Sequence, residues 1–224
     1  MDGVRLRASI LLNMPDFRNV FERVQNQVII GNAHLSLWKR LGKRISGLNN
    51  IVANTAPTFL GMTLDAHLCA AFLYAARVFD THHDALTIHT ILRKAGHEMG
   101  TLSPKTQKVV RGNLSSAKTK LLALQAIVDS VRTRRDKVLA HLDLKVITHP
   151  DEVTRESQIS VKELENLFRA AWEILNEISG SFWEITSILD LVDIDDYERP
   201  MSLIEKAKKI EREEYEAEFG PLPD

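Results

Sequence analysis

The sequence predicts an all-α protein, a helical bundle with additional helices near both ends, and three observations support this fold class. Apolar residues recur at spacings of three and four along most of the chain, which is the period of an amphipathic helix. We find no stretch with the strict apolar–polar alternation of a half-buried strand, and no internal repeat. A chain of 224 residues is long enough to bury the core of one domain and to carry an appendage.

The first half of the chain predicts four helices, at residues 17–28, 35–52, 60–79 and 84–94. Gly31-Asn32 is expected to interrupt the first two, because glycine and asparagine are weak in helix interiors. Residues 54–58, which contain a proline, predict a turn before the third helix. Gly96 and Gly100 are expected to end the fourth helix.

A long basic helix is predicted to begin at Ser103 and Pro104. Serine can cap the first amide groups of a helix, and proline is tolerated in the first turn because its missing N–H has no partner there. An apolar stripe from Val110 to Val131 continues this helix into the segment Val131–Asp143. Residues 145–159 then predict a loop.

A second long helix is predicted to begin at residues 160–163, whose sequence Ser-Val-Lys-Glu is a capping box. Its apolar positions continue at helical spacing to Val192. Residues 202–217 predict a last helix without a full apolar stripe, which is therefore either exposed or docked on another surface. We divide the chain into a helical domain, residues 1–199, and a charged helical C-terminal tail, residues 200–224.

Composition and charge limit the classes of protein to consider. Cys69 is the only cysteine, so no intramolecular disulfide can form, and the first residues lack the layout of a signal peptide. We expect no apolar run of membrane-spanning length and interpret the protein as cytoplasmic. Net charge is −1, but residues 99–137 carry +7 and residues 190–224 carry −7. The basic stretch could attract a polyanion, although a solvated helix face would look the same.

The last turns of the basic helix place two chemically active side chains beside its apolar seam. On a regular helix of 100° per residue, the seam passes through Val131, Val138 and Leu142, and Arg135 and His141 lie on its two sides. An arginine beside an apolar seam is costly unless an anion or a second chain meets it there. These two residues are therefore the candidates for chemistry.

The spacing of these residues resembles the signature of the HEPN superfamily, in which four to six residues separate an arginine from a histidine and a polar residue follows the arginine. Arg135, Asp136 and His141 fit this signature. The sequence of residues 135–143, Arg-Asp-Lys-Val-Leu-Ala-His-Leu-Asp, is similar to sequences of the AbiU-like abortive-infection branch. An upstream Arg-x-x-Asp, formed by Arg77 and Asp80, resembles the same branch. The resemblance covers roughly residues 30 to 190 and implies a HEPN-like up-and-down helical bundle.

The resemblance implies a metal-independent endoribonuclease without cofactors, acting as a toxin or abortive-infection effector in antiviral defence. Its site would form at the interface of a homodimer, its substrate would be RNA, and an antitoxin or other regulatory partner would restrain it. His141 would take the proton from a ribose 2′-OH, since a neutral imidazole is available near neutral pH. Arg135 would hold two phosphate oxygens in its planar fork as charge accumulates on them. The products would be a 2′,3′-cyclic phosphate and a 5′-OH.

Neighbouring residues supply supporting roles and one alternative assignment. Arg134 precedes His141 by seven residues, so it also fits the signature, but the acidic residue after Arg135 favours Arg135. Asp136 would orient the guanidinium of Arg135. The same segment supplies two further cations as RNA-binding candidates, Lys137 and Arg132.

Two other interpretations of these residues stay open. Arg132 and Arg135 could simply pair with Asp129 and Asp136 at a basic helix end, in a non-catalytic helical dimerisation or binding module with a HEPN-like fold. Four residues that can ligate metals also lie close together, His82, His83, Asp84 and His89. They match no metal motif, so we expect no dedicated metal site.

Overall fold

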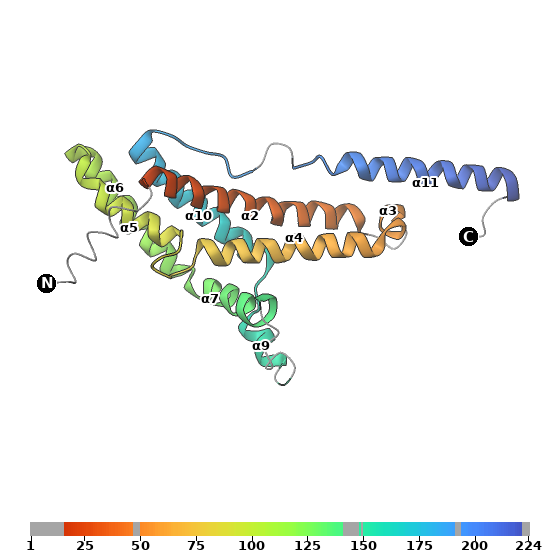
Figure 1. The fold of residues 1–224 in the computed structure, drawn as a ribbon, viewed down its shortest axis with the longest axis horizontal. Helices are drawn as coiled ribbons and strands as arrows, with labels where there is room; N and C mark the ends of the chain where they lie inside the picture. Colours follow the sequence, from red (N-terminus) through yellow and green to blue (C-terminus); the bar gives the residue numbers. More distant parts are fainter. Residues whose placement is uncertain (1–15, 47–49, 141–147, 149, 191–193, 221–224) are drawn as a thin grey trace. The chain divides into compact units, whose positions relative to one another are not determined.

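The computed structural model describes residues 16–46, 50–140, 148, 150–190 and 194–220, and these residues form helices and no strand (Figure 1). The predicted all-α fold is confirmed. The contacts divide the chain into two compact units. Unit 1 comprises Met1–Gly31 and Phe72–Leu189, and unit 2 comprises Asn32–Ala71 and Asp190–Asp224.

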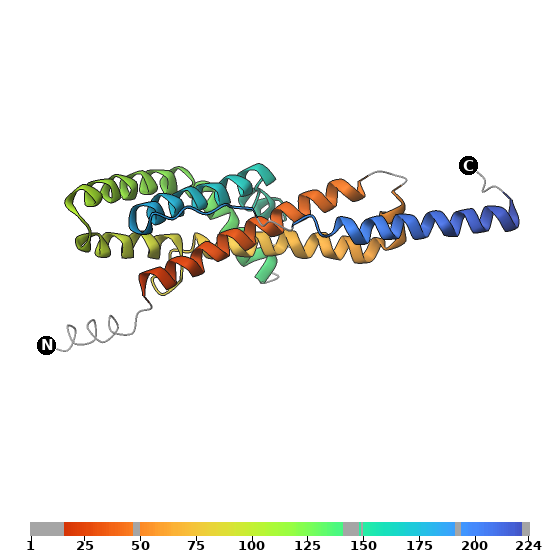
Figure 2. The same ribbon diagram turned by 90° about the horizontal axis from the view of Figure 1, so that it is seen from above.

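Unit 1 is a helical bundle built largely around α10. It contains the start of α2 (Phe17–Ile45), the end of α4 (Pro57–Val78), and the elements α5 (Ile88–Glu98), η1 (Met99–Thr101), α6 (Pro104–Ala123), α7 (Gln125–Arg134), η2 (Arg135–Ala140), α9 (Pro150–Glu156) and α10 (Val161–Trp183). Helices α5, α6 and α10 lie side by side (Figure 2). The apolar stripe of α10 is buried from Leu164 to Ile178. This burial is the main apolar contribution of α10 to the bundle.

The two helix starts predicted from capping residues, at Ser103 and Ser160, are confirmed. The hydroxyl of Ser103 accepts a hydrogen bond from the amide of Thr106 at 3.3 Å, with Pro104 as the first helical residue of α6. The hydroxyl of Ser160 accepts one from the amide of Glu163 at 3.2 Å, and the Glu163 carboxylate accepts one from the Ser160 amide at 2.7 Å. Each cap satisfies amide groups that the helix itself leaves unpaired.

The predicted break at Gly31-Asn32 is wrong, because α2 runs unbroken from Phe17 to Ile45. A Cβ atom at Gly31 would lie 2.5 Å from Cε1 of Phe168 and 2.7 Å from Cβ of Tyr74. Phe168 is fully buried. Gly31 therefore serves the close approach of α2 to α10 and α4, which requires the absence of a side chain.

The end of α10 also differs from the prediction. The helix ends at Trp183, and Glu184 adopts a left-handed backbone with φ of 56°. The chain then folds back along α10, where the side-chain amide of Asn176 binds the backbone of Ser187 through both its oxygen and its nitrogen, at 3.0 and 3.1 Å. The indole of Trp172 donates to the same Ser187 carbonyl at 3.1 Å. Ile185 and Leu189, which extended the predicted stripe, belong to this returning segment, and Val192 lies outside the described residues.

The basic helix is divided into α6 and α7 at Leu124, and it continues into η2. The Leu124 amide donates to the carbonyls of both Lys120 and Leu121 at 3.2 Å, which tightens the turn at this point. The predicted loop 145–159 contains α9 (Pro150–Glu156) in its described part. The helix predicted at residues 84–94 begins later than predicted, because α5 begins at Ile88 with Thr87 as its N-cap.

Unit 2 contains the end of α2, α3 (Ile51–Thr55), the start of α4 (Pro57–Val78) and α11 (Glu198–Phe219). Its buried cluster comprises Leu41, Val52, Leu60 and Met201. Arg44 pairs with Glu205 at 2.7 Å and with Glu198 at 3.3 Å, and the Glu205 and Glu198 carboxylates raise the pKa of Arg44. The first turns of α11 are therefore docked. The predicted division at residue 199 stays a prediction.

Helix α4 (Pro57–Val78) is long and apolar enough to cross a membrane by length and composition, which corrects the expectation that no apolar run has this length. Within the tested stretch 28% of the residues are buried. A core helix of a globular protein passes the same test, so a single such helix among the described residues is weak evidence for a membrane span. The cytoplasmic interpretation stays a prediction.

A histidine pair in unit 2 predicts a fall in stability at mildly acidic pH. The Nδ1 atoms of His34 and His67 lie 2.8 Å apart, so one ring must accept a hydrogen bond in its neutral form. Burial, and for His34 also repulsion from His67, lowers the pKa of both below the ordinary value of 6.5. The folded state then binds fewer protons than the unfolded state, so stability is full above about pH 6.5 and is lost as pH falls.

We expect the unfolding temperature of the wild type to drop between pH 7.5 and pH 5.5, and His67→Gln to reduce this drop. Burial also lowers the pKa of His89 in unit 1, so part of the pH dependence remains in the variant. The exposed His97 supplies the control, since His97→Gln should behave as the wild type. An unchanged pH dependence in His67→Gln would contradict the assignment.

Candidate functional site

Arg135 is the first residue of η2, directly after α7, and two carboxylates hold its guanidinium. Its Nε donates to Asp136 at 2.6 Å and its Nη1 donates to Asp80 at 3.2 Å. The side chain is 28% exposed, and the Asp136 and Asp80 carboxylates raise its pKa further above its ordinary range. Its Nη2 forms no hydrogen bond with any residue that the structure describes. Arg135 is therefore fixed in direction and keeps one donor edge for an anion.

Asp80 belongs to the loop between α4 and α5, and this loop is held from three sides. Its Oδ1 accepts a hydrogen bond from the His82 amide at 2.8 Å, and its other oxygen meets Arg135. Arg132 on α7 donates to the Phe79 carbonyl at 2.8 Å, and Arg93 on α5 donates to the His83 carbonyl at 3.1 Å. The His82 amide, followed by Arg135, lowers the pKa of Asp80. Asp80 is therefore a carboxylate held in place against Arg135.

The i, i+3 spacing of Arg77 and Asp80 allows a structural ion pair between them, and from the sequence the two residues could also support the active-site helix. In the structure the guanidinium of Arg77 lies over the ring of Tyr74, 5.6 Å from its centroid. Asp80 instead meets Arg135, which lies 55 positions later in the chain. The spacing of neighbouring residues cannot predict a contact between residues 55 positions apart, because pairs on a helix surface are three or four residues apart.

The turn that carries Arg135 is π-helical, which changes the predicted seam. Val131 is buried, as predicted, but Val138 is 38% exposed. A π-turn closes hydrogen bonds between residues five apart, so it contains more residues than an α-turn and shifts the faces that follow. Leu142 and His141 lie outside the described residues, and so does Asp143.

The other predicted cations of this segment all have structural contacts. The guanidinium of Arg134 lies 4.7 Å from the ring centroid of Phe72, and its buried Nε has no hydrogen-bond partner among the described residues. Lys137 pairs with Glu156 of α9 at 2.6 Å, and Arg132 holds the Asp80 loop. The predicted contact of Arg135 with Asp136 is present. The proposed roles of these residues toward RNA stay predictions.

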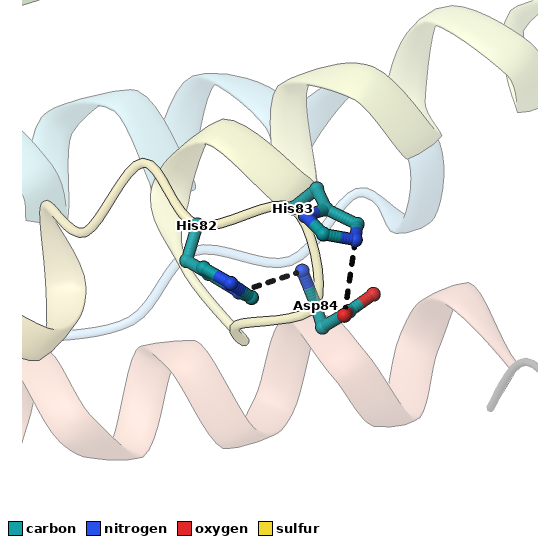
Figure 3. A group of neighbouring side chains, drawn as sticks. All are labelled: His82, His83 and Asp84. Carbon is teal, nitrogen blue, oxygen red and sulfur yellow. Dashed lines mark hydrogen bonds and ion pairs between the residues drawn. The ribbon is translucent and has the colours of Figure 1, made fainter.

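Figure 3 shows a group of three adjacent side chains on the same loop, His82, His83 and Asp84. Their potential ligand atoms lie within 4.8 Å of one another, and all three residues are exposed. Asp84 pairs with His83 at 3.0 Å, and its amide donates to Nδ1 of His82 at 3.4 Å. These interactions connect the three residues to one another, and the expectation of no dedicated metal site stays a prediction. His89, the fourth residue of the sequence group, lies in the first turn of α5.

Comparison with known proteins gives a match over most of the chain. The HEPN_AbiU2 family model, described as AbiU2, matches residues 14–198. The matched stretch includes the Asp80 loop and the segment that begins at Arg135. No curated protein and no solved structure matches the chain.

Proposed function

The chain belongs to the AbiU2 family of HEPN abortive-infection proteins, and from this membership we propose that it is a metal-independent endoribonuclease. It acts as a toxin-like effector of antiviral defence and needs restraint by a regulatory partner or a trigger. The observation that carries the proposal is the guanidinium of Arg135, held by Asp80 and Asp136 with its Nη2 edge open. An arginine fixed in this way is suited to grip a phosphate.

In the proposed reaction His141 is the general base. Its neutral imidazole takes the proton of the ribose 2′-OH, and the 2′-oxygen forms a bond to the adjacent phosphorus. The bond from phosphorus to the 5′-oxygen breaks, and the imidazolium returns its proton to that oxygen. Arg135 stabilises the charge that accumulates on the phosphate oxygens. DNA is spared because it has no 2′-OH.

We propose that a homodimer completes the site. The resemblance to the HEPN superfamily implies a composite site at a dimer interface, to which both chains contribute. Two copies related by a two-fold axis can combine Arg135 of one chain with His141 of the other. The exposed Val138, three positions after Arg135, supplies apolar surface that a second chain could cover.

A cleavage assay tests the proposal. Purified protein is incubated in EDTA with a labelled RNA and with DNA of the same sequence, beside the variants His141→Ala and His149→Ala. We expect RNA fragments with 2′,3′-cyclic phosphate ends from the wild type and from His149→Ala, and none from His141→Ala. Circular dichroism and the unfolding temperature should agree among the three proteins.

Intact RNA after incubation with a dimeric wild type, tested on several RNAs, would argue against the ribonuclease. Equal cleavage by His141→Ala would argue against the proposed base. The first result would favour the second interpretation, a non-catalytic helical dimerisation or binding module with a HEPN-like fold, whereas the second would move the role of the base to another residue.

A further inference from the structure

A groove of about 720 Å³ lies between α5 and α6 in unit 1. Its α5 side runs from His89 to His97 through positions spaced by three and four residues, which is one face of a helix. Its other side runs from Leu114 on α6 to Gln125, the first residue of α7. The groove is therefore a feature of two regular helix faces and is independent of loops.

The lining of the groove combines apolar, basic and neutral polar groups. Four leucines from the two helices and Gly96 supply the apolar part. Arg93 and Lys118 supply the charges, two histidines and Gln125 supply further polar groups, and no acidic residue of the described part of the chain lines the groove. A ligand that fits has a flat apolar body, polar edges and an anionic group. A nucleotide has these three properties.

Each part of a nucleotide has a counterpart in this lining. The face of a base can pack on the leucines and on an imidazole, as in sequence-tolerant binding of single strands. The amide of Gln125 can both donate to and accept from a base edge. Arg93 and Lys118, on opposite helices, can meet the phosphate.

The groove is linked to the candidate catalytic arginine along α7. At the groove end, the side chain of Gln125 donates to Asp129 at 2.8 Å, and Asp129 lies 3.8 Å from Arg132. Arg132 holds the loop of Asp80, which in turn binds Arg135. The axial rise from residue 125 to residue 135 is about 15 Å.

Two residues of α5 also connect the groove to the same loop. Arg93 donates to the loop at the His83 carbonyl, 3.1 Å away. His89 lines the groove in the first turn of α5, and burial, followed by the charge of Arg132, lowers its pKa. The groove and Arg135 are thus close enough to contact one short stretch of a single RNA strand.

We propose that the α5/α6 groove binds one nucleotide of the RNA substrate strand and thereby sets the position of the cut phosphate; this inference rests on the proposed ribonuclease function. Charge favours RNA over a second copy of this chain as the occupant. One side of the groove, from Leu114 to Gln125, lies within the stretch 99–137, which carries +7, so the same stretch of a second copy would be repelled.

The test measures binding separately from cleavage. The probe is a fluorescent 2′-O-methyl oligoribonucleotide, which has no free 2′-OH and cannot be cut by the proposed reaction. Lys118→Glu should weaken its binding about tenfold relative to Lys108→Glu, since one groove-bound nucleotide contributes that much. Lys108 is an exposed lysine of the same helix outside the groove, so this control removes the general effect of charge reversal.

A second pair of variants fills the groove without changing charge. A Cβ at Gly96 would lie 3.9 Å from Cδ1 of Leu114, in ordinary contact, so Gly96→Leu should fold while its side chain occupies part of the groove. Gly112 on α6 has nothing within 4 Å of its Cβ position and lies outside the groove. We expect weaker probe binding for Gly96→Leu and wild-type binding for Gly112→Leu, with unfolding temperatures at or above the wild type for both.

Three results would overturn the inference. First, the groove variants could bind the probe with the same affinity as their control variants. Mixed nucleoside 5′-monophosphates could bind in the groove without competing with the probe, which would make a free nucleotide the occupant. The groove variants could instead turn a dimer into a monomer in sedimentation, which would make a second copy the occupant.

A cleavage measurement on unmodified RNA separates this inference from the proposed function. If the wild type binds the probe through the groove and leaves RNA uncut, the ribonuclease proposal fails while the groove stands. If Gly96→Leu cuts the same positions with the wild-type KM, the groove proposal fails while the ribonuclease stands.

Discussion

Arg135→Ala is expected to reduce the rate of RNA cleavage by two to three orders of magnitude, roughly the loss that follows removal of one donor to an anionic transition state. The reason is the geometry of its guanidinium, which meets Asp136 through Nε and Asp80 through Nη1 and leaves Nη2 for the phosphate. Most of the loss should appear in kcat. RNA affinity should change little, because the two carboxylates already offset the charge of Arg135.

Two further variants make this expectation specific. Arg135→Lys keeps the positive charge but has one ammonium in place of a planar fork, so it should be nearly as slow as Arg135→Ala. Arg134→Ala should keep most activity and lose stability, since Arg134 lies over the ring of Phe72. If Arg134→Ala abolishes cleavage and Arg135→Ala does not, the catalytic assignment moves to Arg134.

Gly31→Ala is expected to destabilise the protein by about 2 kcal/mol, the middle of the range for overpacking a filled core. The new methyl group would lie 2.5 Å from Cε1 of Phe168 and 2.7 Å from Cβ of Tyr74. Phe168 has no exposed surface, so its ring has little room to move. For a chain of this size the unfolding temperature should fall by roughly 4–8 °C.

The matched control is Gly112→Ala in the interior of α6. Nothing lies within 4 Å of its Cβ position, so only the helix propensity changes. Replacing a glycine by alanine in a helix stabilises by about 0.5–1 kcal/mol, and the unfolding temperature should rise by about 2 °C. A Gly31→Ala variant as stable as Gly112→Ala would contradict the close approach of α2 to α10.

The sequence predicted those parts of the fold that depend on neighbouring residues. The caps at Ser103 and Ser160 are local hydrogen bonds, and both were read correctly. Gly31 was misread because a glycine required for close packing and a glycine required for a turn look alike in one sequence. The end of α10 was misread because Asn176 binds Ser187, and the helical spacing of the apolar residues does not reveal that they turn back.

In the candidate site, too, the contacts between neighbouring residues were predicted and the contacts between distant residues were not. The contact between Arg135 and Asp136 follows from adjacency and was predicted. The contact between Lys137 and Glu156 was missed, because α9 lies in a segment expected to be a loop. Asp80 was considered as a partner of Arg77 or as support for the active-site helix, but its pairing with Arg135 was not predicted, because that pairing depends on how α4 and α7 pack.

The π-turn η2 affects how an extra residue can be inserted between the arginine and the histidine of the HEPN signature. In an α-helix, one added residue rotates every later side chain by about 100°. A π-turn can confine an added residue to a single wide turn and leave the helices before and after it in their own phases. Loss of one residue within Arg135–Ala140 would let the turn return to α geometry. The number of residues between the arginine and the histidine therefore does not by itself determine the angle between their side chains.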